Sequence, residues 1–277
     1  MHKLKYGSLT TLKYLTLIIG VFGALAPLVV VLFASFKDTM EYHNTSALTP
    51  PMHWLNFDNY VTAFTKGQML TGFKNTLIIM VVAILGNIFI GTMIAYVLQR
   101  FRFRGRGAIM AAFLFAALIP GVTTQVITFQ IVHWLGLFNS MGAAIVLYMG
   151  TDIIGIYVFI QFMDNISSQL DESAMIDGAS YFTIFTKIIF PLLTPAIVTM
   201  TIIKGIGIYN DFYIPFLYMP DPSLRTISTS LFAFKGPFGS HWETICAAVM
   251  IIIAPTAILF VALQKYIYSG FTQGAVK

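Results

Sequence analysis

A short acidic segment between two long apolar runs carries the residues of this chain that are best suited to chemistry in water. It contains the adjacent carboxylates Asp171 and Glu172, and Gly178 follows them. Read as a helix, the segment places both carboxylates in the first turn, where they favour the positive end of the helix dipole. Gly178 permits a bend, and a second helical stretch covers residues 181–190 before Pro191. The pattern predicts two short helices joined at a glycine corner, which together offer a charged binding surface.

No grouping for catalysis or metal binding accompanies this surface. The chain contains no Gly-rich loop that ends in Gly-Lys-Ser or Gly-Lys-Thr, so nothing in it is suited to cradle a nucleotide. Its 5 histidines are scattered, with no pair at metal-ligand spacing, and no Ser/His/Asp grouping can be argued. We therefore expect no catalytic residue and no metal site. The energy for any work would come from a partner or from an ion gradient.

The composition is that of an integral membrane protein. Hydrophobic residues make up 57% of the 277 residues and charged residues only 10%, whereas soluble domains carry about 25% charged residues. Six continuous apolar runs reach the roughly 20 residues that cross a bilayer, and their continuity favours helices over alternating strands. The runs cover residues 14–36, 76–98, 108–132, 141–163, 193–216 and 245–267. The sequence predicts an all-α fold, with residues 1–277 forming a single transmembrane domain of six helices.

The distribution of arginine predicts the orientation of these helices. Residues 99–107 hold four arginines, whereas the short connection 133–140 holds no Lys or Arg. Because basic residues mark cytoplasmic loops, we place residues 99–107 in the cytoplasm, together with both termini and the acidic loop 164–190. Residues 37–75 and 217–244 are then external, and the second of these, rich in Phe, Pro and Gly, is predicted to form a folded element. The bias explains the basic pI of about 9.2 without nucleic acid.

The acidic segment also resembles a known family motif. The spacing of Glu172, Ser173, Ala174, Gly178 and Pro191 is similar to the EAA loop of ABC importer permeases, which reads Glu-Ala-Ala, three residues, Gly, nine residues, Ile-x-Leu-Pro. Serine replaces the first alanine, and phenylalanine replaces the leucine before the proline, but the register is intact. Further segments resemble the carbohydrate permeases related to the smaller maltose permease subunit. They are residues 59–60, 73–76, 96–106, 136–137, 176–179, 209–212, 264–266 and 274–277.

This resemblance implies a function, a set of partners and a site. It implies a permease subunit of a bacterial carbohydrate ABC importer, in the cell membrane and in contact with lipid. Its partners would be a second, homologous permease subunit, two cytoplasmic ATPase subunits and an extracytoplasmic sugar-binding protein. ATP and Mg would be used by the ATPase, and this chain would bind no cofactor. The residues implied to couple the permease to the ATPase are Glu172, Ser173, Ala174, Asp177 and Gly178.

Two opposite charges lie inside the predicted spans. Asp152 lies about 11 residues into the fourth run and Lys204 about 11 residues into the fifth, so each is roughly 16 Å from a membrane surface. A charge at that depth must be paired or must face water. Two interpretations stand equally: a buried ion pair that fixes helix packing, or side chains that line a substrate path.

Polar residues in two spans are candidates for the walls of a sugar passage. Amides, carboxylates and aromatic faces bind sugar hydroxyls and rings, and such groups occur in the fifth and third runs. The candidates are Tyr209, Asn210 and Asp211 in the fifth run and Thr124 and Gln125 in the third. For the third run, hydrogen bonding between helices is the alternative, because it needs no substrate.

An ion-coupled secondary transporter is the main alternative function. In that case Asp152 and Asp211 would be ion or proton sites within the membrane. This alternative accounts for the intramembrane charges but gives no reason for the EAA-like loop. A membrane-embedded enzyme ranks third, since no catalytic grouping supports it.

Overall fold

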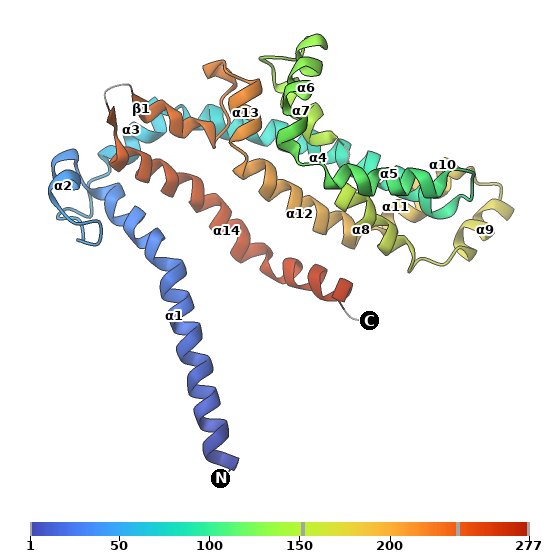
Figure 1. Ribbon diagram of the computed structural model, residues 1–277, viewed down its shortest axis with the longest axis horizontal. Coiled ribbons are helices and arrows are strands. Elements are labelled where there is room, and N and C mark those ends of the chain that lie inside the picture. Colours follow the sequence, from blue (N-terminus) through green and yellow to red (C-terminus); the bar gives the residue numbers. More distant parts are fainter. Residues whose placement is uncertain (1, 151–152, 237–238, 276–277) are drawn as a thin grey trace. The chain divides into compact units, whose positions relative to one another are not determined.

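Helices make up most of the chain in the computed structural model, which describes residues 2–150, 153–236 and 239–275 (Figure 1). The backbone alone is described for residues 2–12 and for most residues after 262. The chain divides into two compact units. Unit 1 consists of Met1–Leu70 and Ser230–Leu259, and unit 2 consists of Thr71–Thr229 and Phe260–Lys277.

Three described helices are long and apolar enough to cross a membrane by themselves. Their mean hydropathies over the best 18-residue window lie between 2.6 and 2.8. They are residues Lys13–Phe36 of α1 (His2–Phe36), all of α4 (Met69–Arg100), and residues Trp242–Ala262 of α14 (Trp242–Ala275). These helices contain the first, second and sixth apolar runs of the sequence.

Three further spans are pairs of helices that meet at a bend. If each pair crosses the membrane as one span, the described chain has up to 6 spans, which agrees with the prediction from apolar runs. The bends measure 102°, 42° and 72°. The pairs are α5 (Arg106–Leu118) with α6 (Gly121–Trp134), α7 (Met141–Met149) with α8 (Ile153–Met163), and Tyr181–Leu192 with α12 (Thr194–Asn210).

The third apolar run does not form the continuous helix predicted for residues 108–132. Helix α5 ends at Leu118, and Ile119 has an extended backbone with φ −78° and ψ 117°. Pro120 follows, and its ring disfavours helical geometry at the residue before it and removes a backbone donor. The 102° bend therefore has a local cause in the sequence.

The fifth apolar run is interrupted as well. The sequence predicts one span over residues 193–216, but α12 ends at Asn210 and Asp211 is extended, with φ −71° and ψ 117°. A separate short helix, α13 (Tyr213–Tyr218), follows it. The run thus supplies a long helix and a short one with a polar residue at the junction.

The core of unit 2 forms where α4 packs with α8, α12 and the π-helical turn η1 (Phe185–Ile189). Tyr96 of α4 contacts Phe185, with ring centroids 5.5 Å apart. At Gly91 a Cβ atom would lie only 3.3 Å from the ring of Phe159, so this glycine lets α4 and α8 approach closely. The packing ties the middle of unit 2 to the segment that follows the acidic loop.

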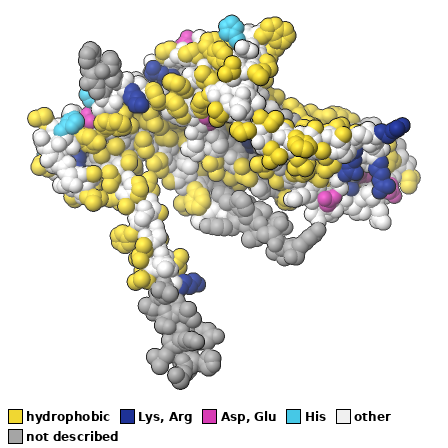
Figure 2. Space-filling model, viewed as in Figure 1, with side chains coloured by type: hydrophobic (Ala, Val, Ile, Leu, Met, Phe, Trp, Pro, Cys, Tyr) yellow, Lys and Arg dark blue, Asp and Glu magenta, His cyan; other side chains and the backbone are white. Residues whose placement is uncertain are grey.

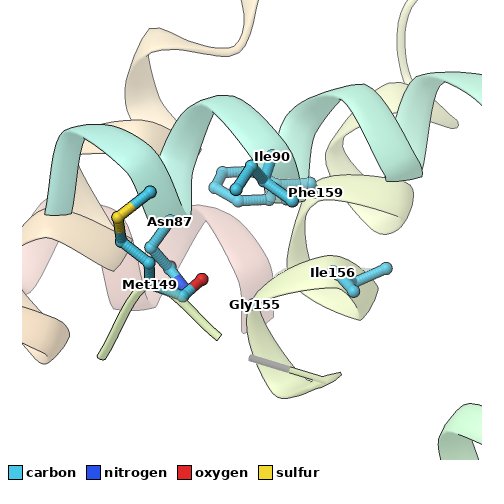
Figure 3. A pocket seen from close by; sticks show the side chains of 7 residues that line it. Asn87, Ile90, Met149, Gly155, Ile156 and Phe159 are labelled. Carbon is cyan, nitrogen blue, oxygen red and sulfur yellow. The ribbon is translucent and has the colours of Figure 1, made fainter. Parts of the chain in front are cut away.

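Asn87 of α4 supports the end of α7 within the fourth span. Its side chain is buried, and Nδ2 donates hydrogen bonds to the carbonyl oxygens of Gly150 (3.0 Å) and Met149 (3.4 Å). Figure 3 shows Asn87 beside Met149 at the edge of a crevice that Phe159 and Ile156 also line. The empty space in and in front of the crevice is about 220 Å³, part of which is open solvent, so the crevice has no enclosed room for a ligand. We therefore interpret it as a packing defect at the break.

Asn75 and Thr76, at the start of α4, hold the folded segment that follows α13. Asn75 Nδ2 donates to the carbonyl oxygens of Ser223 and Arg225, each at 2.9 Å, and the backbone N–H of Ile227 donates to Thr76 Oγ1 at 2.9 Å. The segment contains a 3-10 turn, η2 (Pro222–Leu224), and a second one, η3 (Thr229–Phe234), follows. The segment is folded over its described residues, and its external placement stays a prediction.

In unit 1, polar side chains fix the chain after α1. Lys37 is buried, and its Nζ donates to Thr45 Oγ1 (2.8 Å) and to the carbonyl oxygen of Ser46 (2.9 Å). Asn59 Nδ2 donates to the carbonyl oxygens of Lys37 (2.7 Å) and Ser35 (3.1 Å). The remaining elements are α2 (Thr39–Asn44), α3 (Asp58–Lys66) and a short antiparallel pair, β1 (Lys235–Gly236) and β2 (Gly239–Ser240).

Replacing Asn87 with leucine should lower the stability of the whole chain, because the two carbonyl oxygens at the end of α7 would lose their donor. Hydrogen bonds between membrane helices contribute about 0.6 kcal/mol on average and at most about 1.7 kcal/mol. We expect a loss in this range, measured as thermal unfolding of the purified chain in detergent. The control is Leu85→Ala on the same helix, where the side chain is exposed. Equal unfolding temperatures for Asn87→Leu and the unmodified chain would contradict this role.

Candidate coupling site

The glycine corner predicted from the sequence is present at the end of helix α9 (Gln169–Ile176). Gly178 has φ +80°, a conformation that glycine adopts without steric cost. The N–H of Ala179 donates to the carbonyl oxygen of Ala174 at 2.9 Å, and the N–H of Gly178 donates to that of Met175 at 3.0 Å. This double hydrogen bond is a Schellman motif, which ends the helix and sets the direction of the chain beyond it.

A second helical segment follows the corner, as predicted. It begins with α10 (Tyr181–Ile184), where the hydroxyl of Ser180 accepts a hydrogen bond from the N–H of Thr183 at 3.2 Å. It continues through η1 and α11 (Phe190–Leu192), and at Leu193 it meets α12 with a bend of 72°. The acidic helix is therefore connected to the fifth span through the glycine corner, one short helical segment and this bend.

The exposed side chains around the corner form what we name the coupling surface. Glu172 and Asp177 supply its negative charge, and Ile176, which is 87% exposed, supplies its largest exposed apolar group. Figure 2 shows Lys and Arg side chains gathered over the same end of unit 2, where α9 and α10 lie in Figure 1. The coupling surface consists of Glu172, Ser173, Met175, Ile176, Asp177, Tyr181 and Phe182, while Ala174 is half-buried and Gly178 is exposed.

One acidic residue of α9 faces inward. Asp171 is buried and its Oδ2 lies 3.0 Å from Nε of Arg100, the last residue of α4. Burial raises the pKa of Asp171, and the neighbouring guanidinium of Arg100 opposes that rise. The sequence analysis used Arg100 for membrane orientation and for the family resemblance, and did not predict this ion pair. The sequence features that could have indicated the pair are an arginine at the end of a span and a carboxylate next to the EAA-like glutamate.

The predicted sugar-path residues lie on two helices. Thr124 is exposed on α6, and its hydroxyl donates to the carbonyl oxygen of Gly121 at 3.1 Å, within the same helix. Gln125 beside it is half-buried. At the end of α12, Tyr209 is half-buried, and the exposed Asn210 donates from Nδ2 to the carbonyl oxygen of Ile206 at 3.0 Å. Their assignment to a sugar path stays a prediction.

Asp211 joins several elements of unit 2. Its Oδ2 accepts a hydrogen bond from the hydroxyl of Tyr148 at 2.9 Å, and its Oδ1 accepts from the N–H groups of Tyr213 (2.7 Å) and Ile214 (3.3 Å). Its carbonyl oxygen accepts from Ser228 Oγ at 2.6 Å. The carboxylate therefore satisfies the start of α13 and fixes α7 beside it. This geometry is that of a helix cap at the break in the fifth run.

Comparison with known proteins identifies the family. A family model described as "Binding-protein-dependent transport system inner membrane component" matches residues 87–273, which include the acidic helix, the glycine corner and the fifth span. The chain belongs to this family. Its members are permease subunits, so the importer interpretation and the absence of an enzymatic role both follow from membership.

Individual permeases match this chain in sequence over almost its full length. The starch degradation products permease AmyC of Thermoanaerobacterium thermosulfurigenes is 32% identical over 271 residues, covering 96% of this chain and 97% of AmyC. The arabinooligosaccharides permease AraQ of Halalkalibacterium halodurans is 29% identical over 92% of each chain. The trehalose/maltose permease MalG of Thermococcus litoralis is 29% identical over 87% of this chain and 82% of MalG.

A solved structure confirms the all-α permease fold. A chain of a bacterial ABC transporter that imports the acidic polysaccharide alginate superposes with a TM-score of 0.81, covering 93% of this chain and 95% of that chain. The two sequences are 19% identical, so the likeness concerns the fold alone.

Only one residue of the predicted intramembrane pair lies in the described part of the chain. Asp152 lies outside the described residues. Lys204 is half-buried on α12. Pairing of Asp152 with Lys204 stays a prediction.

Substitutions at Asp211 of the permease should separate capping from a role for its charge. Asp211→Asn keeps an oxygen that can accept from the N–H groups of α13, so we expect the unfolding temperature to stay close to that of the unmodified chain. Asp211→Leu removes this acceptor and should destabilise by about 1 to 2 kcal/mol. The control is Asn210→Ala, because Asn210 is exposed and bonds only within its own helix in the described part. An equal loss in Asp211→Asn and Asp211→Leu would refute the capping role.

Proposed function

We propose that this chain is the membrane permease of an ATP-driven importer that takes up a sugar or oligosaccharide delivered by an extracytoplasmic binding protein. The family assignment supports the importer and its dependence on a binding protein. Relatives named for starch degradation products, arabinooligosaccharides and trehalose/maltose support the sugar. The observation that carries the proposal is the exposed coupling surface on two helices in EAA-like register.

We infer that the coupling surface docks on an ATPase subunit in the cytoplasm. Ile176, Tyr181 and Phe182 expose apolar surface around the glycine corner, and an exposed apolar patch with charged groups at its rim indicates an interaction site. Glu172 is exposed in the first turn of α9, where it can pair with a basic residue of the ATPase. ATP and Mg would be bound by the ATPase, of which the assembly has two copies, and a second homologous permease subunit would complete the passage.

The arrangement supplies a route for mechanical coupling. Movement of the ATPase subunits would displace α9. The glycine corner would transmit this displacement to α10 and η1, and from there to α12. Spans that can adopt two packings would then exchange between inward-open and outward-open states. The binding protein would favour one state and ATP would set the direction.

The orientation follows from the same surface. The cytoplasmic placement of α9 puts both termini in the cytoplasm and the folded segment after α13 outside. The exposed Arg102 and Arg104, close to the end of α4, support this orientation, because basic residues accumulate on the cytoplasmic side.

Glu172→Ala should reduce uptake about tenfold or more while the chain still inserts, because a lost hydrogen bond between charged groups costs about 1.5 to 3 kcal/mol. The measurement is ATP-dependent uptake of labelled malto- and arabino-oligosaccharides by vesicles that contain the assembled transporter. Gln169→Ala, an exposed position in the same helix, is the control. Normal uptake in the Glu172→Ala transporter would show that docking does not depend on this residue.

Thiol labelling should establish the orientation. In a Cys246→Ala background, a membrane-impermeant maleimide added outside intact cells should react with Lys235→Cys and should not react with Ser173→Cys. Both positions are exposed, so access to solvent is matched. Reaction of Ser173→Cys from outside would overturn the cytoplasmic placement of α9, and with it the docking of an ATPase there.

A further inference from the structure

We propose that the ion pair between Arg100 and Asp171 is a positioning device, which fixes α9 to the end of α4 so that force on the coupling surface reaches the second span. The proposal rests on the docking of an ATPase at the coupling surface. Arg100 and Asp171 are positioning residues here, since neither belongs to that surface.

Asp171 is the one buried residue of α9. All 8 residues of the helix are described, and the other 7 are exposed or half-buried. The side chain of Asp171 is 10% exposed and that of Arg100 is 12% exposed. The half-buried Ala174 packs against the core of unit 2, but a helix with no fully buried apolar side chain gains little from hydrophobic packing, so the contact of Asp171 contributes strongly to its position.

Arg100 holds the segment at two points. Its Nε faces Asp171 in the first turn of α9, and its Nη2 donates to the carbonyl oxygen of Ile166 at 2.8 Å, in the connection before the helix. One planar guanidinium therefore fixes both the start of α9 and the chain that leads into it. Lysine could not replace it without loss, because an ammonium group does not offer donors in a fixed fork.

The second helix is attached in a different way. Tyr181 of α10 contacts Phe101, with ring centroids 5.0 Å apart, and Tyr96 contacts both Phe101 (5.7 Å) and Phe185 (5.5 Å). These aromatic contacts anchor α10 and η1 to the end of α4 by apolar packing. The ion pair fixes α9, which lies on the other side of the glycine corner from these aromatic contacts.

The pair is suited to fixing geometry and poorly suited to adding stability. Burial of both charges costs free energy, and within the described residues neither Arg100 Nε nor Asp171 Oδ1 makes a hydrogen bond. Apolar residues of similar volume would often be as stable at such a place. They would not hold the segment at two points, whereas Arg100 combines its contact with Asp171 and its hydrogen bond to the carbonyl oxygen of Ile166.

The first experiment needs no partner. A spin label is attached at Gln169→Cys of the full chain in a Cys246→Ala background, and its mobility is measured in lipid nanodiscs. Asp171→Asn, which keeps the volume, should increase the mobility, and Arg100→Lys should do so less. The exchange of Arg100→Asp with Asp171→Arg should restore part of the ordering. Arg104→Met, at an exposed arginine, should leave the mobility unchanged. Unchanged mobility in Asp171→Asn would overturn the proposal.

The second experiment measures coupling. The full transporter, with its ATPase subunits, is treated with magnesium-ATP and vanadate, and the labelling rate of Lys235→Cys by an impermeant maleimide is compared with that in the absence of nucleotide. We expect this ATP-driven change to fall about fivefold or more in Asp171→Asn, which corresponds to a lost coupling free energy above about 1 kcal/mol. Co-purification should show that the ATPase still binds.

The outcomes separate the positioning role from docking itself. Higher mobility at position 169 with an undiminished ATP-driven change would show a structural contact without a role in coupling, and would overturn the proposal. Failure of the ATPase to bind the unmodified chain would instead refute the proposed function. In that case, the spin-label mobility still decides whether the ion pair fixes α9.

Discussion

The hydrocarbon of a membrane offers no hydrogen bonds, so every interruption of a spanning helix has to be satisfied from within the protein. Helix α4 meets this constraint in unit 2. It has 32 residues, or about 48 Å at 1.5 Å per residue, and thus exceeds a hydrocarbon core of about 30 Å. Asn75, Asn87 and Arg100 follow one another along it at intervals of about 18 and 20 Å. Each binds a different non-helical piece of the chain: the segment after η2, the end of α7, and the connection to α9.

The same constraint explains why residue type alone cannot reveal a sugar path. Amides and carboxylates inside a span are expected at a binding site, and they are expected equally at a break in a helix. Asp211 is a residue type expected at a binding site, but its hydrogen bonds are those of a helix break. Its carboxylate accepts hydrogen bonds from Tyr148, Tyr213 and Ile214. Asn75 and Thr76 at the start of α4 likewise bind backbone groups of their own chain, in the segment that contains Ser223 and Ile227.

The sequence predicted the spans and the glycine corner because both depend on local rules. Apolar length sets the spans, and a positive φ with a Schellman ending requires glycine at position 178. It did not predict the 102° bend, although Pro120 was visible, because a proline can kink or end a helix and the choice depends on what packs beyond it. The pairing of Arg100 with Asp171 was also missed. Contacts between residues far apart in the chain depend on how the helices pack, and the residue composition does not reveal that packing.

The depth of each polar residue along α4 determines which chemistry it can use. Asn87 lies near the middle of the helix, where a neutral amide can be buried at modest cost and a charge cannot. Arg100 is the last residue, at the end proposed to face the cytoplasm, where water lowers the cost of burying a charge. On α4, the free-energy cost of burying an ion pair is therefore lowest where the helix leaves the membrane. A water-soluble ATPase can act at the same end. The neutral contact of Asn87 thus lies in the middle of the long helix, and the charged contact of Arg100 lies at its end, near the proposed docking site of the ATPase.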